Sequence, residues 1–404
     1  MTNFRWVVAG LMFCATALSF FDRQVLSVLA PRILADLRIG NVEYSNAVSA
    51  FTLAYSVMFT LGGRMIDFWG TRMGLGVAVA FWTLASLLHA MVRGPGDLTL
   101  YRFLLGVGEG GCFPGAARGI LEWFPARERA LAMGIATTGG SAMGAVLAPP
   151  LIVWVSSLVG WRGAFLVTGA IGVVWVVLWF VLYRTPAVAV STVSHADKPW
   201  PMGRLLARKE VWGLLVARFV FDPVFYFYMF WIPQYLSRER GASLEQIGKL
   251  AWIPFLTLGI SSLLGGALSD SLVRRGWTIG KARKTVMTAA ALLTPVSMLA
   301  MVAPDAFWAV VLMAVLMFAH GFWMTNYMTL IGDLFPAASV GTVVGLTGTA
   351  GGLAGFLSSL AIGRIVEAVS FGPVLIACGV LYPVGLVVLL VTIPRVERLG
   401  VSEQ

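Results

Sequence analysis

The chain has 404 residues, of which 58% are hydrophobic and 12% are charged, and its formal net charge is +10. Soluble globular domains carry about 25% charged residues, so this composition excludes a soluble domain. The apolar runs are continuous rather than alternating, which excludes an outer-membrane barrel and predicts an all-α membrane protein.

A helix needs about 20 mostly apolar residues to cross a bilayer. Windows of this kind predict twelve spans. In chain order they cover residues 6–34, 44–69, 73–93, 98–123, 129–158, 161–183, 211–237, 245–273, 283–303, 306–335, 340–369 and 372–393. The N-terminal residues run into the first span without a small-residue cleavage site, so we expect a retained helix rather than a signal peptide.

The basic residues are distributed unevenly between the two sides that this topology creates. With an even number of spans and a cytoplasmic N-terminus, 17 basic residues fall in cytoplasmic segments and 8 in outside segments. Cytoplasmic loops of membrane proteins carry such an excess, which predicts a multi-pass protein of a bacterial inner membrane with both termini in the cytoplasm. The positive charge therefore reflects topology, and we expect a lipid bilayer rather than nucleic acid as its partner.

Four charged residues fall deep inside predicted spans. Asp22 and Arg23 are adjacent in LSFFDRQVL of the first span, and Arg102 and Glu109 lie in the fourth. A charge at membrane depth costs about 2.5 to 3.5 kcal/mol on insertion scales and marks a pathway or a paired network. The seven-residue spacing of Arg102 and Glu109 returns the helix to nearly the same face. Adjacent residues point in different directions, but Asp22 and Arg23 can both border one cavity.

These four residues allow two interpretations. They could form a structural ion-pair cluster that holds the first and fourth spans together. Alternatively, Glu109 and Asp22 bind protons and thereby release Arg102 and Arg23 from internal pairing. A free guanidinium then offers a fork of donors that binds a carboxylate through two parallel hydrogen bonds. The second interpretation predicts that a proton and a small organic anion cross together.

The remaining cavity groups are predicted from polar residues on spans that face the centre. Any of them could instead make an interhelical hydrogen bond or lie in an interfacial belt. The candidates are Tyr55, Thr138, Ser141, Tyr226, Tyr228, Gln234 and Asn326. We find no sequence pattern for a nucleotide-binding loop, a metal cluster or a nucleophile triad, so we expect no enzyme, no catalytic residue, no cofactor and no metal. Energy would come from an ion gradient.

The two halves of the chain repeat each other. A polar segment at 185–210 separates an N-terminal six-helix unit (1–184) from a C-terminal one (211–404). Asp67 in GRMIDFWGTR and Asp270 in GALSDSLVRRG are 203 residues apart, close to half the chain. Internal repeats with a substrate site at their interface are typical of secondary transporters.

These repeated connections and the six-plus-six layout resemble the major facilitator superfamily. FFDRQVLSVLAP, RFLLGVGEGGCFPGA and RRGWTIGKARKT further resemble its anion:cation symporter family, most closely the hexuronate transporter branch. The resemblance implies twelve transmembrane helices in two pseudo-symmetric six-helix bundles. It implies proton coupling through Asp22 and Glu109 and substrate binding through Arg23 and Arg102. It also implies that Asp67 with Arg72, and Asp270 with Arg274 or Arg275, close the cytoplasmic gate.

The expected function is import of a hexuronate such as glucuronate or galacturonate with protons, by a monomer working through alternating access. A carrier for another organic anion, such as an aldonate, an aldarate or a monocarboxylate, stays open as an alternative. So do a transporter-like sensor, drug efflux and sodium coupling. Aldonate carriers of the family have an amide in the fifth span where this chain has Gly140, which disfavours an aldonate.

Overall fold

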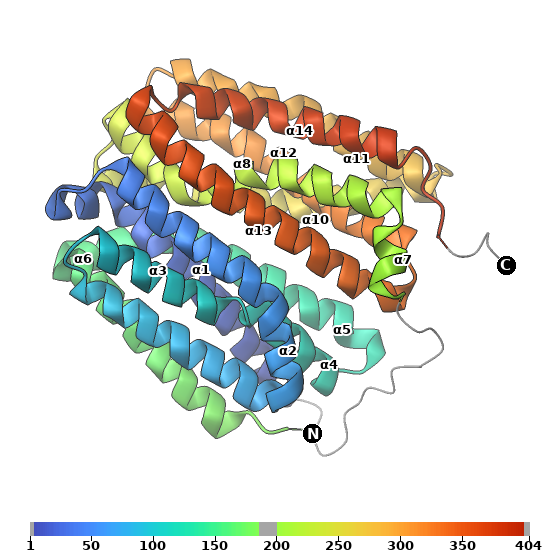
Figure 1. Ribbon diagram of the computed structural model, residues 1–404, viewed down its shortest axis with the longest axis horizontal. Helices are drawn as coiled ribbons and strands as arrows, with labels where there is room; N and C mark the ends of the chain where they lie inside the picture. The colour runs from blue at the N-terminus through green and yellow to red at the C-terminus, as the bar shows by residue number, and fades with distance from the viewer. Residues whose placement is uncertain (1–3, 186–199, 400–404) are drawn as a thin grey trace. The chain divides into compact units, whose positions relative to one another are not determined.

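The computed structural model describes residues 4–185 and 200–399, except for the side chains at 67, 126, 127, 130 and 337. Helices make up most of this part of the chain (Figure 1). Up to residue 185 they are α1 (Phe4–Leu37), α2 (Asn41–Leu88), the 3₁₀ helix η1 (His89–Met91), α3 (Pro95–Glu109), α4 (Cys112–Trp123), α5 (Ala126–Met133), the π-helix η2 (Gly134–Gly139) and α6 (Gly140–Leu182). From residue 200 they are α7 (Met202–Leu206), α8 (Lys209–Arg240), α9 (Leu244–Leu250), α10 (Ile253–Arg274), α11 (Ile279–Leu293), the 3₁₀ helix η3 (Thr294–Val302), α12 (Ala306–Leu334), α13 (Ala337–Ala368) and α14 (Gly372–Thr392).

The predicted all-helical membrane fold is confirmed, and each predicted span lies mostly on helical residues. Within the described residues, nine helical stretches are long and apolar enough to cross a membrane. One of them, Leu131–Leu182, is 52 residues long and contains both the fifth and the sixth predicted span. The second and fourth spans do not appear among the nine, and the fourth is divided between the short helices α3 and α4.

Two glycines separate predicted spans that run on as one helical element. Gly70 in α2 has a φ of 75° and Gly160 in α6 has a φ of 72°. Both angles lie in the left-handed region, which glycine enters without a steric penalty. The chain therefore changes direction at these glycines, where the second span gives way to the third and the fifth to the sixth.

By internal contacts the chain forms two compact units. The first consists of Met1–Val193 with the segments Tyr228–Trp252 and Gly355–Val369, and the second contains the rest. The boundary thus falls inside α8 after Phe227 and inside α13 after Ala354. The division into six-helix halves at residues 184 and 211 stays a prediction.

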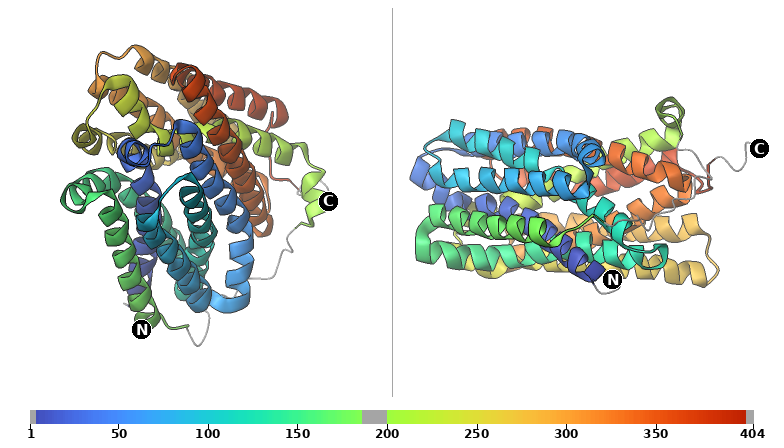
Figure 2. Two further views of the ribbon diagram at one scale, coloured as in Figure 1. Left: turned by 60° about the vertical axis from the view of Figure 1, so that its left-hand side comes forward. Right: turned by 90° about the horizontal axis from the view of Figure 1, so that it is seen from below.

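In the first unit, α1 packs against α6 and α2 packs against α3 (Figures 1 and 2). Glycines allow the close approach of α6 to α1. A Cβ atom at Gly140 would lie 2.0 Å from the Oγ1 of Thr16, and one at Gly144 would lie 2.2 Å from the carbonyl oxygen of Ala17. Small residues of this kind let helix backbones meet inside a membrane.

The first unit also includes the far ends of α8 and α13, which pack on α1 and α2. Ser27 donates a hydrogen bond of 3.0 Å to the carbonyl of Met229, and the Tyr44 hydroxyl donates one of 2.5 Å to the carbonyl of Phe230. On α13, Glu367 accepts a bond of 2.8 Å from the Asn41 side-chain amide. Residues far apart in the sequence are therefore held together at this end of the first unit.

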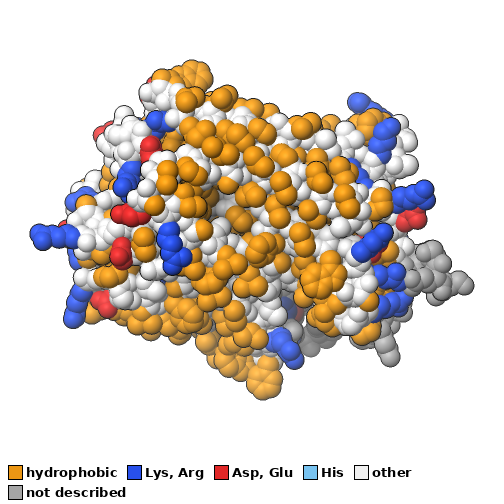
Figure 3. Space-filling model, turned by 45° about the horizontal axis from the view of Figure 1, so that its top comes forward, with side chains coloured by type: hydrophobic (Ala, Val, Ile, Leu, Met, Phe, Trp, Pro, Cys, Tyr) orange, Lys and Arg blue, Asp and Glu red, His pale blue; other side chains and the backbone are white. Residues whose placement is uncertain are grey.

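In the second unit, α12 packs against α10 and α11, and α14 packs against η3 and α11. On the face in Figure 3, hydrophobic side chains cover the middle and charged side chains gather toward the ends. Many large apolar side chains are exposed, including Leu263 at 75% and Val391 at 72%. Exposed apolar surface on this scale suits a lipid environment rather than water.

Candidate functional site

Helix α1 places its two adjacent charged residues, Asp22 and Arg23, in the interior. Asp22 is 2% exposed and Arg23 is 3% exposed. The Nε of Arg23 donates a hydrogen bond of 2.6 Å to the Oε2 of Glu109 at the end of α3. Ser19, one helical turn before Arg23, donates a bond of 2.9 Å to the same oxygen. Arg23 and Glu109 form a buried, charge-assisted ion pair that joins α1 to α3, and Ser19 adds a second hydrogen bond to it.

Aromatic rings surround the guanidinium of Arg23. Its central carbon lies 4.3 Å from the ring centre of Tyr55, 4.7 Å from that of Phe20 and 5.5 Å from that of Phe51. A planar guanidinium gains cation–π attraction from such faces, and the gain is larger where water is excluded. Tyr55, one of the predicted binding residues, therefore lies directly against the guanidinium of Arg23.

Arg102 on α3 is buried differently. It is 1% exposed, and among the described residues its Nε and Nη2 have no hydrogen-bond partner. Its guanidinium carbon lies 5.9 Å from the ring centre of Phe51. Although Glu109 lies on the same helix, its hydrogen-bonded arginine is Arg23, and its Oε1 has no partner in the described part of the chain. Arg102 thus has two buried N–H groups that can donate hydrogen bonds to a nearby acceptor.

Asp22 lies beside this cluster without pairing with its neighbour in sequence. Ser86 of α2 donates a hydrogen bond of 3.0 Å to its Oδ1. The carboxyl is close enough to Glu109 and Arg102 for appreciable electrostatic interaction. One unit thus brings together two acids and two bases from α1 and α3, with supporting hydroxyls from α1 and α2.

The other predicted polar residues differ in burial and in their hydrogen-bond partners. Thr138 is exposed in η2, and Ser141, at the start of α6, donates to the Thr137 carbonyl one turn earlier in η2. Gln234 donates to Asn41 at 3.1 Å, and Asn326 donates to the carbonyls of Gly265 and Phe322. The bonds of Gln234 to Asn41 and of Asn326 to Gly265 are interhelical, which is the alternative that the sequence left open for these two residues.

Three further positions bear on the cavity prediction. Tyr228 is fully buried in the first unit, whereas Tyr226 is half-buried in the second. Gly140 packs directly against Thr16 and Phe13 of α1, so an amide side chain would not fit there without moving α1.

Asp270 has a partner that the sequence did not single out. Its carboxylate pairs at 2.7 Å with Arg283 of α11 rather than with Arg274 or Arg275. Arg274 is exposed at the end of the helix that carries Asp270, whereas Arg283 reaches across from α11 and also approaches Asp333 at 3.4 Å. Arg283 is 8% exposed, so a buried cation serves two carboxylates.

The corresponding connection in the first unit is partly described. The side chain of Asp67 lies outside the described residues, and Arg72 donates a bond of 2.8 Å to the carbonyl of Phe180. Nearby, Glu122 accepts bonds from the hydroxyls of Thr71 and Tyr183.

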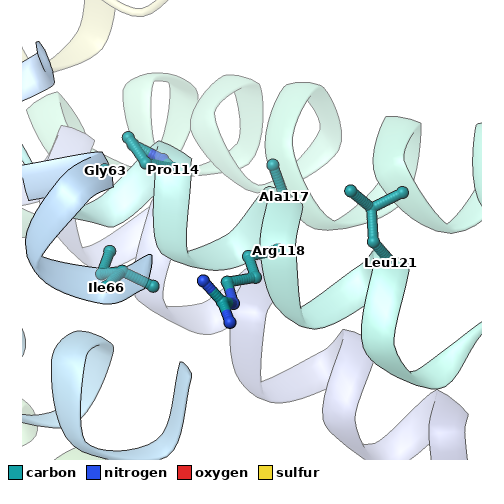
Figure 4. A pocket seen from close by; sticks show the side chains of 6 residues that line it. All are labelled: Gly63, Ile66, Pro114, Ala117, Arg118 and Leu121. Carbon is teal, nitrogen blue, oxygen red and sulfur yellow. The ribbon is translucent and has the colours of Figure 1, made fainter. Parts of the chain in front are cut away.

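A surface groove of about 360 Å³ lies between α2 and α4 (Figure 4). Its lining consists of Gly63, Ile66, Pro114, Ala117, Arg118 and Leu121. Arg118, the charged member, pairs with Glu122 at 3.0 Å. The lining shares no residue with the predicted substrate site, and its one cation is already paired within its own helix.

The sequence did not single out several residues that complete the buried cluster. Ser19 and Ser86 supply hydroxyl donors to the two acids, and Phe20 and Phe51 cover Arg23. Ser19 could have been found, because a residue four positions before Arg23 shares its helix face. Ser86 could not, because its approach to Asp22 depends on packing between α1 and α2.

Comparison with known proteins gives consistent results. The profile of the Major Facilitator Superfamily matches residues 12–359. The chain is 28% identical over 418 residues to the hexuronate transporter of Escherichia coli K12, covering 99% of this chain and 96% of that protein. It is 27% identical over 423 residues to the D-galactonate transporter of Escherichia coli O6:H1, covering 98% and 97%.

Among solved structures, a bacterial homolog of the human lysosomal transporter Spinster, described as inward-facing and unoccupied, is similar to this chain with a TM-score of 0.73. The two share 18% sequence identity, and the alignment covers 97% of this chain and 96% of that one. At this identity the similarity concerns the fold.

Proposed function

Because the chain belongs to the Major Facilitator Superfamily and is a transport protein rather than an enzyme, we propose that it imports a hexuronate, such as glucuronate or galacturonate, together with protons. The observation that carries this proposal is the pair of N–H groups on Arg102 that are buried without a partner among the described residues. Two such groups on one planar guanidinium suit a carboxylate ligand.

The substrate class follows from the chemistry of the cluster. A carboxylate would accept two hydrogen bonds from Arg102, while Tyr55 and its neighbouring rings offer aromatic faces and a hydroxyl to a sugar ring. The named relatives carry hexuronate and D-galactonate, which supports a sugar acid as the organic anion. Gly140 has no room for an amide side chain, which favours a uronate over an aldonate.

Proton coupling is proposed at Glu109, with Asp22 as the second acid. While Glu109 is ionised it holds Arg23 through a bond of 2.6 Å. Protonation removes the negative charge, weakens that bond and leaves Arg23 able to join Arg102 on the substrate anion. An anion inside low-dielectric surroundings is stabilised only when its charge is balanced, so the proton and the anion enter together.

The cycle would proceed by alternating access, with the cytoplasmic connections that carry Asp67, Arg72, Asp270 and Arg274 as gating elements. We place both termini in the cytoplasm, on the basis of the 17 cytoplasmic and 8 outside basic residues. We further propose that the protein works as a monomer in a bacterial inner membrane.

Reconstituted protein tests this proposal. Purified protein in liposomes is given labelled glucuronate under an imposed pH gradient, an imposed sodium gradient, or neither. We expect accumulation with the pH gradient alone. The Glu109→Gln variant should exchange glucuronate across the membrane without gradient-driven accumulation, because the amide cannot release a proton.

Three outcomes would contradict the proposal. Undiminished proton-driven accumulation by Glu109→Gln would remove Glu109 from the coupling step, and accumulation with sodium alone would replace the proton. Competition by unlabelled galacturonate, galactonate, glucarate and lactate identifies the preferred anion. Stronger competition by galactonate than by galacturonate would replace the hexuronate with an aldonate.

A further inference from the structure

A second buried ion pair lies in the other unit, and the proposed transport chemistry does not use it. On α8, the Nε of Arg218 donates a bond of 3.0 Å to the Oδ2 of Asp222, with side chains that are 13% and 7% exposed. The Nη1 of Arg218 also reaches the hydroxyl of Thr347 on α13 at 3.4 Å. Burying charges in a membrane segment is costly, so a pair of this kind marks a functional position.

Helix α13 meets this ion pair with its backbone. A Cβ atom at Gly351 would lie 1.8 Å from the Oδ2 of Asp222 and 3.2 Å from the Cγ of Arg218. A larger residue fits there only if the Asp222 side chain is shortened or moves, or if one helix moves. Helices α8 and α13 are therefore in direct contact at the level of Asp222, and the charges lie at the contact.

Both helices have weakened backbones at this same level. Pro223 directly follows Asp222 and has no N–H, so α8 lacks one backbone hydrogen bond there. Helix α13 carries glycines at positions 351, 352 and 355. The boundary between the compact units follows within a few residues, after Phe227 in α8 and after Ala354 in α13.

We propose that the Arg218–Asp222 pair, with Thr347, pins α8 to α13 at a shared hinge, so that the two helices bend together during the transport cycle. Beyond the hinge both helices continue into the first unit, where their ends are held by Ser27, Tyr44 and Asn41. Opening that end requires these bonds to break in both helices at once. A pin at the hinge couples the two movements.

A cysteine at position 45 reports on this opening without any substrate. Ser45 of α2 is in contact with Gly363 of α13, because a Cβ atom at Gly363 would lie 2.2 Å from the Ser45 Oγ. In a background with the three native cysteines replaced by serine, Ser45→Cys is exposed to a membrane-impermeant maleimide in proteoliposomes. Its labelling rate measures how often α13 moves away from α2.

The first comparison removes the pin. Arg218→Met with Asp222→Leu deletes both charges at similar volume, and we expect reporter labelling to slow about fivefold or more, the range of ordinary conformational coupling. Without the ion pair, the ends of α8 and α13 no longer move together and stay bonded to Ser27, Tyr44 and Asn41. The matched control is Glu245→Gln with Lys249→Gln, an i,i+4 pair whose side chains are 74% and 70% exposed, which should label at the unmodified rate.

The second comparison replaces the ionic pin with a covalent one. In Arg218→Met with Asp222→Cys and Gly351→Cys, the new cysteines can form a disulfide, because a Cβ at Gly351 lies 2.7 Å from the Asp222 Cγ. We expect oxidation to restore fast reporter labelling and reduction to slow it again. Both states belong to one folded protein, so the comparison does not depend on the other variants folding well.

Three results would overturn the hinge: labelling at the unmodified rate in the charge-deleted variant, equal rates in the oxidised and reduced forms, or a block on oxidation. A block would mean that α8 and α13 must separate at Asp222. Because the reporter needs no ligand, failure of the hinge and failure of glucuronate as substrate are read separately.

Discussion

Replacing Arg102 with methionine should make the substrate-free protein more stable while removing its ability to bind substrate. The guanidinium has two buried N–H groups without partners among the described residues. Each buried donor left unsatisfied costs about 1 to 3 kcal/mol, so the two together destabilise the protein by about 2 to 6 kcal/mol. The lost attraction to Asp22 and Glu109 offsets part of this, and we expect a net gain of about 1 to 3 kcal/mol.

Binding should change in the opposite direction. A hydrogen bond to a charged group contributes about 1.5 to 3 kcal/mol. Two parallel bonds from Arg102 to a carboxylate therefore correspond to a loss of affinity of about a hundredfold or more in the methionine variant, since about 1.4 kcal/mol is tenfold. Glu109 keeps its partner Arg23 in this variant, so that ion pair stays intact.

Thermal unfolding of the purified protein, with and without glucuronate, measures both effects. A ligand that binds the native state raises the unfolding temperature. Arg102→Met should unfold a few degrees higher than the unmodified protein and show no further rise with glucuronate. Arg93→Met, which removes an exposed positive charge, should behave like the unmodified protein. A less stable Arg102→Met variant, or one that still responds to glucuronate, would refute the reasoning.

Three other substitutions have definite expected results. Gly144→Ala should lower the unfolding temperature, because its Cβ would lie 2.2 Å from a backbone oxygen of α1, while Gly134→Ala, with no atom within 4 Å, should not. Glu367→Gln should speed maleimide labelling of the Ser45→Cys reporter, because the negative charge that accepts two hydrogen bonds from Asn41 is lost. An unchanged labelling rate would mean that these bonds do not hold the closed state together. Arg283→Met leaves two carboxylates without their shared cation, so glucuronate exchange should slow with unchanged competition by other acids, and altered selectivity would contradict a gating role.

The sequence was sufficient to find the buried charges but not their partners. Apolar runs of about 20 residues around Asp22 and Arg102 already require these groups to be internal. The bond between Arg23 and Glu109 depends on how neighbouring helices approach one another. At Gly106, a Cβ would lie 2.4 Å from the carbonyl oxygen of Phe51, so a glycine contact sets the distance between α3 and α2. Spacing along one helix cannot supply that distance.

The repeat shows the same limit. It marks Asp270 as a counterpart of Asp67, because both lie in similar short motifs. It suggested a partner from the adjacent sequence, whereas the cation comes from Arg283, thirteen residues later on α11. A repeat predicts which positions correspond; the partner of a charge depends on which helix packs opposite.

The surroundings of the two arginines predict that exchanging each for lysine has a different effect. Arg23 is held by aromatic faces at 4.3 Å and 4.7 Å and by a bond of 2.6 Å to Glu109, so a lysine would lose the stacking and loosen the resting ion pair. Arg23→Lys should therefore change how glucuronate uptake depends on pH, with a smaller effect on KM. Arg102 has no such bond to lose, and Arg102→Lys replaces a two-donor fork with a point charge. It should raise KM for exchange while the pH dependence stays the same. Transport kinetics measured across a pH series separate the two effects, and identical profiles for the two variants would mean that the arginines share one role.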